Sequence, residues 1–128
     1  TGDKLSAVEV LVAPKAGAPP HTHAKFDESF FVLEGAFEVL LGDKKATAGP
    51  GDFVHIPGGT LHAFTNTTDK LARILSLSAP AGLEEFFRAV GHPVAKVEDR
   101  AKPKPVTAAD AARLVEVGKK YGVEIKKP

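Results

Sequence analysis

The sequence predicts an all-β fold, a small antiparallel sandwich or barrel, followed by a short helical tail. Over the first two-thirds of the 128 residues, short β-prone segments alternate with Gly and Pro turns, which is typical of sandwiches and barrels. After Pro80 the composition becomes helical. The length suits one domain with a single core. Periodicity does not distinguish a barrel from a sandwich, so these observations leave both open.

The expected strands are short, and turn signals separate them. Six segments have this character: residues 5–13, 28–33, 37–41, 53–56, 61–64 and 71–77. The first is rich in valine, and in the third Phe37, Val39 and Leu41 recur at every second position, the period of a strand. Gly- or Pro-containing turns lie at residues 34–35, 42–43, 50–51 and 57–59.

Two helices are expected in the tail. Residues 83–90 have helical composition and stop at Gly91, and residues 95–106 are expected to be an irregular connector. Thr107 to Asp110 resembles a capping box, and Gly122 is placed to end the helix that follows.

The tail is expected to belong to the same folding unit as the strands. We expect residues 1–80 to form the β domain and residues 81–128 to form a helical extension packed on it, as a single structural domain. Phe86 and Phe87 are the expected anchors of this extension.

Composition excludes several classes of function. The net charge is +1 and the lysines are scattered, so we expect no nucleic-acid partner. The chain has no cysteine, hence no disulfide and no thiolate ligand.

No apolar run is long enough to span a bilayer and no signal-like start is visible, so we expect a cytoplasmic protein with no membrane partner. The chain begins Thr1-Gly2 and lacks methionine, and we expect its native N-terminus to be trimmed.

Two short clusters contain side chains that can ligate a metal. The first contains His21, His23 and Glu28, and His62 follows 34 residues later. Prolines before His21 favour extended backbone, in which residues two apart point to one face. Glu28 is an odd number of residues from His23, so the chain must bend between them. His62 must come from a different strand, after the turn at residues 57–59.

Three imidazoles and one carboxylate suit a transition metal. Such a set can bind Fe, Mn, Co, Ni, Cu or Zn, and ligand type does not choose among them. Four protein ligands on an octahedral ion leave two open positions, whereas on tetrahedral Zn they would close the shell. The alternative interpretation is that His21 and His23 are exposed loop residues and His62 is a hydrogen-bonded core residue.

The two clusters resemble the paired motifs of the cupin superfamily, and the resemblance covers about residues 5–79. The second motif matches throughout and the first at its ligands: His21, His23, Glu28 and Gly35, then Gly51, Pro57, Gly59, His62 and Asn66. The first motif departs only at its leading glycine, Gly17, which stands two positions later than usual. The stretch between the motifs has the short length typical of single-domain cupins, or monocupins.

This resemblance implies a fold, a metal site and an assembly. The fold would be a small antiparallel jelly-roll β-barrel, and the metal would be one divalent transition metal ion held inside by His21, His23, Glu28 and His62. Cupins usually dimerise, so a homodimer is expected. The C-terminal extension is similar to that of quercetin 2,3-dioxygenase-like cupins, which implies a dioxygenase acting on an aromatic or enolisable small molecule.

The same resemblance suggests roles for residues around the metal. Glu28 could also serve as general base, as is proposed for quercetinase-like cupins. An apolar, substrate-lining cavity would be formed by Phe30, Val32, Phe53 and Phe64, for each of which ordinary core packing is the alternative.

Two other functions remain open. One is an isomerase or epimerase, which would need a Lys or Arg facing the metal; Arg73 is the main basic candidate for the barrel interior. The other is a non-enzymatic cupin that binds a metal and a small molecule. His55 and His92 are left out of the metal set.

Overall fold

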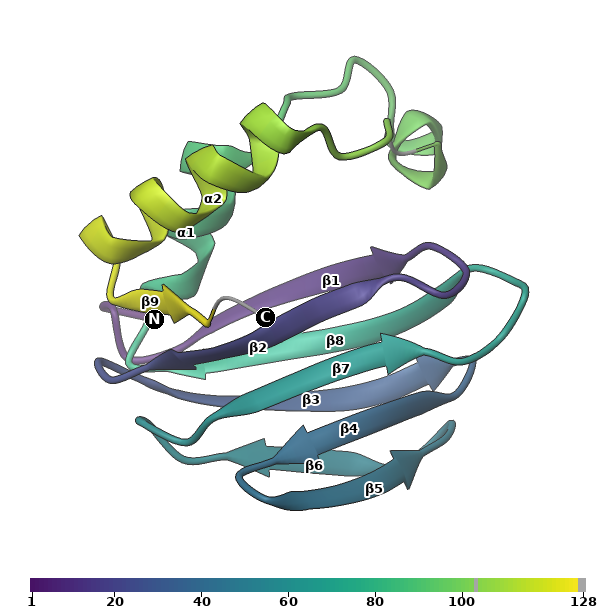
Figure 1. The fold of residues 1–128 in the computed structure, drawn as a ribbon, viewed down its shortest axis with the longest axis horizontal. Helices are drawn as coiled ribbons and strands as arrows, with labels where there is room; N and C mark the ends of the chain where they lie inside the picture. Colours follow the sequence, from purple (N-terminus) through teal and green to yellow (C-terminus); the bar gives the residue numbers. More distant parts are fainter. Residues whose placement is uncertain (103, 127–128) are drawn as a thin grey trace.

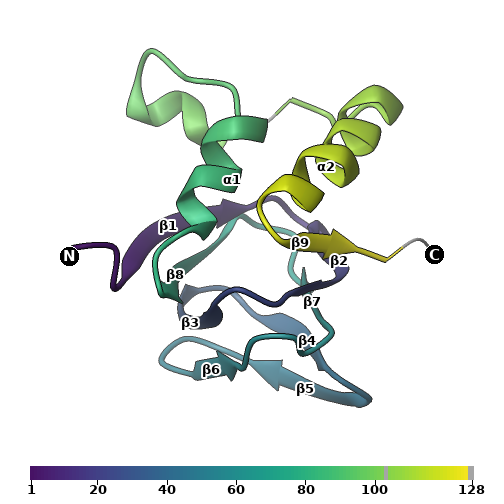
Figure 2. The same ribbon diagram turned by 90° about the vertical axis from the view of Figure 1, so that its left-hand side faces the viewer.

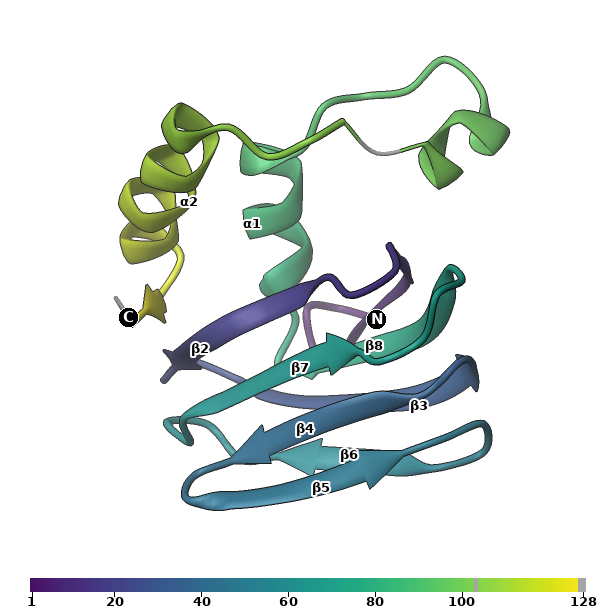
Figure 3. The ribbon, with the colours of Figure 1, turned by 45° about the vertical axis from the view of Figure 1, so that its right-hand side comes forward.

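The computed structural model describes residues 1–102 and 104–126, and its main body is a jelly roll of two antiparallel sheets (Figure 1). One sheet has the order β1 (Ser6–Val12), β8 (Ala72–Ala79), β3 (Asp27–Glu34) and β6 (Phe53–Ile56). The other has the order β5 (Lys44–Ala48), β4 (Phe37–Leu41), β7 (His62–Asn66), β2 (Gly17–His23) and β9 (Val123–Ile125). Figure 3 shows the second sheet with β2, β7, β4 and β5 side by side. The predicted all-β class and jelly-roll barrel are therefore confirmed.

The space between the sheets is filled by alternate residues of the strands. In β3 and β8 every second side chain is buried, the period that a two-layer β fold requires. Nine buried residues form this main core: Val12, Phe30, Val32, Phe37, Val39, Ala48, Ile56, Ala72 and Ile74. Full burial of each large apolar side chain contributes roughly 1.5–3 kcal/mol, so this core is a main source of the barrel's stability.

Gly17, the displaced motif glycine, lies where β2 runs closest to β7. A Cβ atom at this position would lie 1.8 Å from the carbonyl oxygen of Phe64. Beyond it, the register between the two strands shifts between Ala18 and His21. Only glycine permits this approach of the two backbones.

Strand β2 was expected only as extended backbone around His21, and three short elements were not predicted at all. Strand β5 has four exposed residues and buries only Ala48, so it shows no apolar alternation. A 3-10 helix, η1 (Val97–Ala101), lies within the predicted connector. Strand β9 comes from the predicted helical extension and joins the sheet that contains β2. Of the three, only β9 is defined by pairing with a distant segment, since β5 forms a hairpin with the adjacent β4.

The two predicted helices are α1 (Leu83–Val90) and α2 (Ala108–Lys120). The capping box is confirmed: Asp110 N–H donates to Thr107 Oγ1 at 3.1 Å, and Thr107 N–H donates to Asp110 Oδ2 at 2.9 Å. Both helices lie on the side of the barrel formed by β1 and β9 (Figure 2). Within the described residues, no helix is long and apolar enough to cross a membrane.

A second, smaller core lies under these helices. Its buried members are Phe26, Leu83, Phe86 and Val123. Phe86 is therefore an anchor of the extension, as predicted. Phe87 is 37% exposed and lies outside this small core, because the adjacent position on a short helix points about 100° away.

Candidate metal centre

The four predicted ligands converge at one point between the two sheets. His21 and His23 lie in β2, Glu28 in β3, and His62 at the start of β7. One ligand atom from each residue lies within 4.8 Å of the others. The chain bends between His23 and Glu28 and reaches His62 after the turn at residues 57–59, as predicted. The alternative interpretation, two loop histidines and an unrelated core histidine, is wrong.

The ligands are mostly shielded from water. His23 and His62 are each 1% exposed and Glu28 is 6% exposed, while His21 is only partly buried. Ring centroids are 4.1 Å apart for His21 and His62 and 4.6 Å apart for His23 and His62. Three imidazoles packed this closely in a buried site cannot all be protonated without strong mutual repulsion.

Each histidine ring is oriented by a backbone carbonyl. Nδ1 lies 2.7 Å from Pro19 O in His21, 3.3 Å from Phe26 O in His23, and 2.8 Å from Thr60 O in His62. A carbonyl oxygen only accepts hydrogen bonds, so each Nδ1 carries a proton and each ring directs its Nε2 into the site, where the neutral form presents a lone pair. This orientation of a ring through its other nitrogen is typical of metal-binding histidines.

The Nε2 atoms meet the carboxylate of Glu28. Glu28 Oε2 lies 2.8 Å from His23 Nε2 and 3.4 Å from His62 Nε2. The longer distance is outside the usual range for N–H···O bonds, and His62 Nε2 is buried with no hydrogen-bond partner among the described residues. When a ring is neutral, its Nε2 lone pair and the carboxylate oxygen repel one another unless a proton or a metal cation lies between them. These donor atoms therefore fit a bound metal ion.

Electrostatics favour the protonation states that metal binding requires. The pKa of His21 is lowered from 6.5 to about 4, first by burial and then by His62. Burial raises the pKa of Glu28, but interactions of its carboxylate with the nearby rings of His23 and His62 outweigh it and lower that pKa to about 2. At neutral pH His21 is therefore neutral and Glu28 ionised, as metal ligands must be.

Two serines near the site were not predicted from the sequence. Ser76 Oγ donates a 3.2 Å hydrogen bond to Glu28 Oε1. Ser78, opposite Glu28 in the register of β3 and β8, instead bonds to Ser6 through their hydroxyls at 2.6 Å. Both serines are buried on β8. The signal was present in the alternation of β8, where they follow Ala72 and Ile74 at the interior positions.

The predicted substrate-lining residues fall into two groups. Phe30 and Val32 are fully buried in the main core, and Phe64 packs against that core with its ring 5.6 Å from Phe30. Phe53 is 59% exposed and pairs with Phe31, whose side chain is on the opposite face of β3 from Phe30. The prediction that Phe53 faces the interior is wrong, because Ile56, three residues later, occupies the interior position of β6.

The main basic candidate for the barrel interior also lies outside. Arg73 bonds to Glu34 at 3.1 Å and to Glu9 at 3.5 Å on the outer face. No lysine or arginine is among the buried residues of the described chain. His55 is likewise on the outside, where its Nδ1 lies 2.9 Å from Ser29 Oγ.

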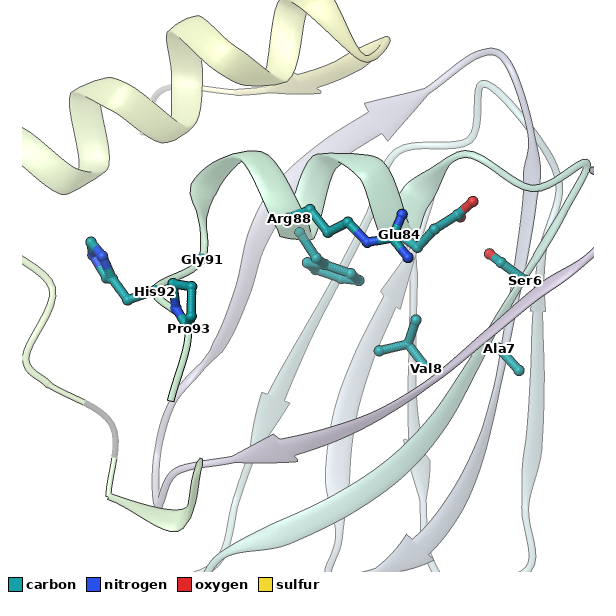
Figure 4. Close-up of a pocket in the computed structure, with 9 residues that line it drawn as sticks. Ser6, Ala7, Val8, Glu84, Arg88, Gly91, His92 and Pro93 are labelled. Atoms are coloured by element: carbon teal, nitrogen blue, oxygen red, sulfur yellow. The ribbon is translucent and has the colours of Figure 1, made fainter. Parts of the chain in front are cut away.

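A surface pocket of about 750 Å³ lies between β1 and α1 (Figure 4). Its lining includes Val8, Phe87, Arg88 and His92. None of the four ligands lines it, so it is separate from the metal centre.

Comparisons with known proteins match the barrel part of the chain. A family model described as a cupin domain matches residues 8–78. Quercetin 2,3-dioxygenase of Bacillus subtilis is 30% identical over 73 residues, which are 57% of this chain and 21% of that enzyme. An uncharacterized protein of Aquifex aeolicus is 36% identical over 73 residues, 57% of this chain and 60% of the relative. The chain thus covers less than two-thirds of either relative.

A solved structure has the same fold and is named for a different activity. A cupin superfamily sugar phosphate isomerase from Silicibacter pomeroyi superposes with a TM-score of 0.56 at 28% identity, over 62% of this chain and 52% of that one. Relatives with these names share a fold and differ in reaction, so the reaction must be argued from the residues of the site.

Proposed function

Because this chain belongs to the cupin domain family, we propose that it is a metal-dependent dioxygenase acting on an aromatic or enolisable small molecule. The observation that carries the proposal is the convergence of one ligand atom from each of three imidazoles and from the Glu28 carboxylate within 4.8 Å inside an apolar barrel. The similarity to a quercetin 2,3-dioxygenase supports the reaction type.

The ligand set would hold one divalent transition metal from the series Fe, Mn, Co, Ni, Cu and Zn. When bound, such an ion would act as a Lewis acid toward a substrate oxygen and O2. The backbone carbonyls of Pro19, Phe26 and Thr60 would keep the three rings aimed at it. The barrel would exclude water, because His23, His62 and Glu28 are nearly inaccessible.

Glu28 would serve both as ligand and as general base. The contacts that lower its pKa to about 2 also make it a weak base in its present position. Accepting a proton from a substrate hydroxyl therefore requires Oε2 to move away from His23. Ser76 holds Oε1 of the same carboxylate, so it would tether the side chain during that movement. This arrangement suits abstraction of one acidic proton, such as that of an enol or a phenol.

The interior favours an aromatic substrate over a phosphorylated one. Phe30, Val32 and Phe64 give the barrel an apolar interior, and no described lysine or arginine is buried within it. A phosphate needs a cationic partner when it leaves water. These features weigh against the sugar-phosphate isomerase alternative and favour a flavonol-like ring system.

An oxygen-controlled assay tests this proposal. Wild-type protein loaded separately with each of the six metals would be incubated with quercetin, with and without O2, beside His62→Ala as the control. We expect loss of the flavonol absorbance that requires O2 and at least one metal, and no loss with His62→Ala. Loss that proceeds equally without O2, or no loss with any metal, would contradict the dioxygenase. Flavonol binding without turnover would then favour the non-enzymatic alternative.

A further inference from the structure

The C-terminal extension contacts the strand that contains two of the metal ligands. Strand β9 pairs antiparallel with β2, placing Val123 opposite His23 and Ile125 opposite His21. Opposite residues in an antiparallel pair direct their side chains to the same face. Val123 and Ile125 therefore flank the two ligand histidines. Figure 2 shows β9 beside β2, directly beneath α2.

On its other edge β2 pairs with β7 at His21, opposite His62, and Gly59 N–H donates to His23 O at 2.9 Å, but the pairing is interrupted before His21. Its pairing with β7 shifts register between Ala18 and His21, and the two residues between them are prolines, which have no N–H to donate. On the β9 side, Lys126 N–H donates to Pro20 O at 2.9 Å. Strand β9 thus adds backbone pairing at the prolines and at Thr22 and His23, which lie beyond the end of β7.

A second contact reaches His23 from the small core. The ring of Phe26 stacks on that of His23, with centroids 4.5 Å apart and an interplanar angle of 22°. The carbonyl oxygen of Phe26 also faces His23 Nδ1. Phe26 is itself buried in the small core with Leu83 and Phe86 of α1 and Val123 of β9. The extension therefore holds the residue that orients His23.

We propose that α1, α2 and β9 form a positioning part of the metal centre and set its metal affinity. Val123 and Phe26 are the positioning residues, because each contacts the ligand strand or a ligand ring and each is fixed by the small core. The family match ends at residue 78, so α1, α2 and β9 lie outside it, whereas Phe26 lies within it. The inference rests on the metal site proposed above.

Glu124 allows the pairing to be tested without disturbing the core. Its side chain is exposed, and it lies opposite Thr22. Hydrogen-bonded pairs alternate along an antiparallel ladder. Since Lys126 bonds to Pro20, Glu124 and Thr22 are the next bonded pair. Glu124→Pro removes this donor, whereas Glu124→Ala keeps it and removes only an exposed ion pair with Lys126.

The measurement is Co²⁺ binding by titration, together with the visible absorption spectrum of the bound ion, which reports its ligands and geometry. We expect Glu124→Pro to weaken Co²⁺ binding about 10- to 100-fold, the usual effect of losing support around ligands, and to alter the spectrum. Glu124→Ala should match wild type in both. Circular dichroism and a cooperative thermal transition would verify that each variant is folded.

A second variant covers the case in which Glu124→Pro fails to fold. A Cβ atom on Gly118 of α2 would lie 2.7 Å from Val123 O, so Gly118→Ala must displace β9 although alanine favours a helix. It should also weaken Co²⁺ binding. Wild-type affinity and spectrum in either folded variant would overturn the positioning role alone. If wild type itself binds no Co²⁺, the metal site fails instead.

Discussion

Ser76 Oγ lies 3.2 Å from Glu28 Oε1, while Oε2 of the same carboxylate lies 2.8 Å from His23 Nε2. The two oxygens of Glu28 therefore have different partners. The serine hydroxyl occupies one oxygen and leaves the other for the histidine cluster. A buried carboxylate held in this way can present a single oxygen to a metal without losing rotamer freedom when the metal binds.

Replacing Ser76 should weaken metal binding while leaving the barrel folded. Ser76→Ala removes the only hydroxyl donor to Glu28 among the described residues, and we expect about a tenfold loss of metal affinity, the lower end of the range for residues that orient ligands. Ser78→Ala is the matched control, because Ser78 lies two residues away on β8 and bonds to Ser6. Isothermal titration with Co²⁺ or Zn²⁺ would compare them. Equal affinities in the two variants would contradict the role of Ser76.

The metal-free protein should lose stability as the pH falls from about 6.5 to 4. The pKa of His21 is lowered to about 4 in the fold by burial and by His62, so in this window the unfolded chain binds a proton that the native state excludes. The pKa of Glu28, lowered to about 2, adds a further loss below about pH 4.5, because its stabilising effect disappears as the pH approaches 2.

Urea unfolding of metal-free protein at pH 7 and pH 4.5 would measure this change. His21→Gln, which cannot titrate, should reduce the difference between the two free energies of unfolding. The same difference in wild type and His21→Gln would show that His21 is not the group responsible.

Truncation of Phe30 should lower the free energy of unfolding far more than truncation of Phe53. Phe30 is fully buried in the main core and Phe53 is 59% exposed on the outer face. Phe30→Ala should lower the free energy of unfolding by about 3–5 kcal/mol, and Phe53→Ala should change it by less than about 0.5 kcal/mol. Thermal or urea unfolding of both variants checks this, and a large loss in Phe53→Ala would contradict its outer placement.

The ligand set was predictable from the sequence because the spacing of these residues constrains the backbone conformation between them. The i, i+2 pair of His21 and His23 required extended backbone, and the odd interval to Glu28 required a bend. Asn66 also matched the motif, but its structural role is visible only in the fold. Its buried amide donates to Lys70 O at 2.8 Å and to Val12 O at 3.1 Å, and it therefore ties β7 to two other segments.

Other features could not be predicted because distant pairing determines them. Phe53 follows a turn, and the sequence does not show which face of the sheet its side chain occupies. Its pairing with Phe31 in the structure places it on the outer face. Arg73 was ambiguous for the same reason, since one step along β8 exchanges inside and outside. Strand β9 has three residues and exists because β2 offers a free edge. The local sequence signal of so short a strand is too weak to predict it.

Metal content of the purified protein tests the central claim most directly, that His21, His23, Glu28 and His62 form one metal site. Wild type and His62→Ala would each be loaded with a divalent transition metal, dialysed and analysed by mass spectrometry of the elements, with circular dichroism to verify the fold. We predict about one tightly held ion per wild-type chain and loss of most of it in folded His62→Ala. An unchanged metal stoichiometry in that variant, or no retained metal in wild type, would contradict the account.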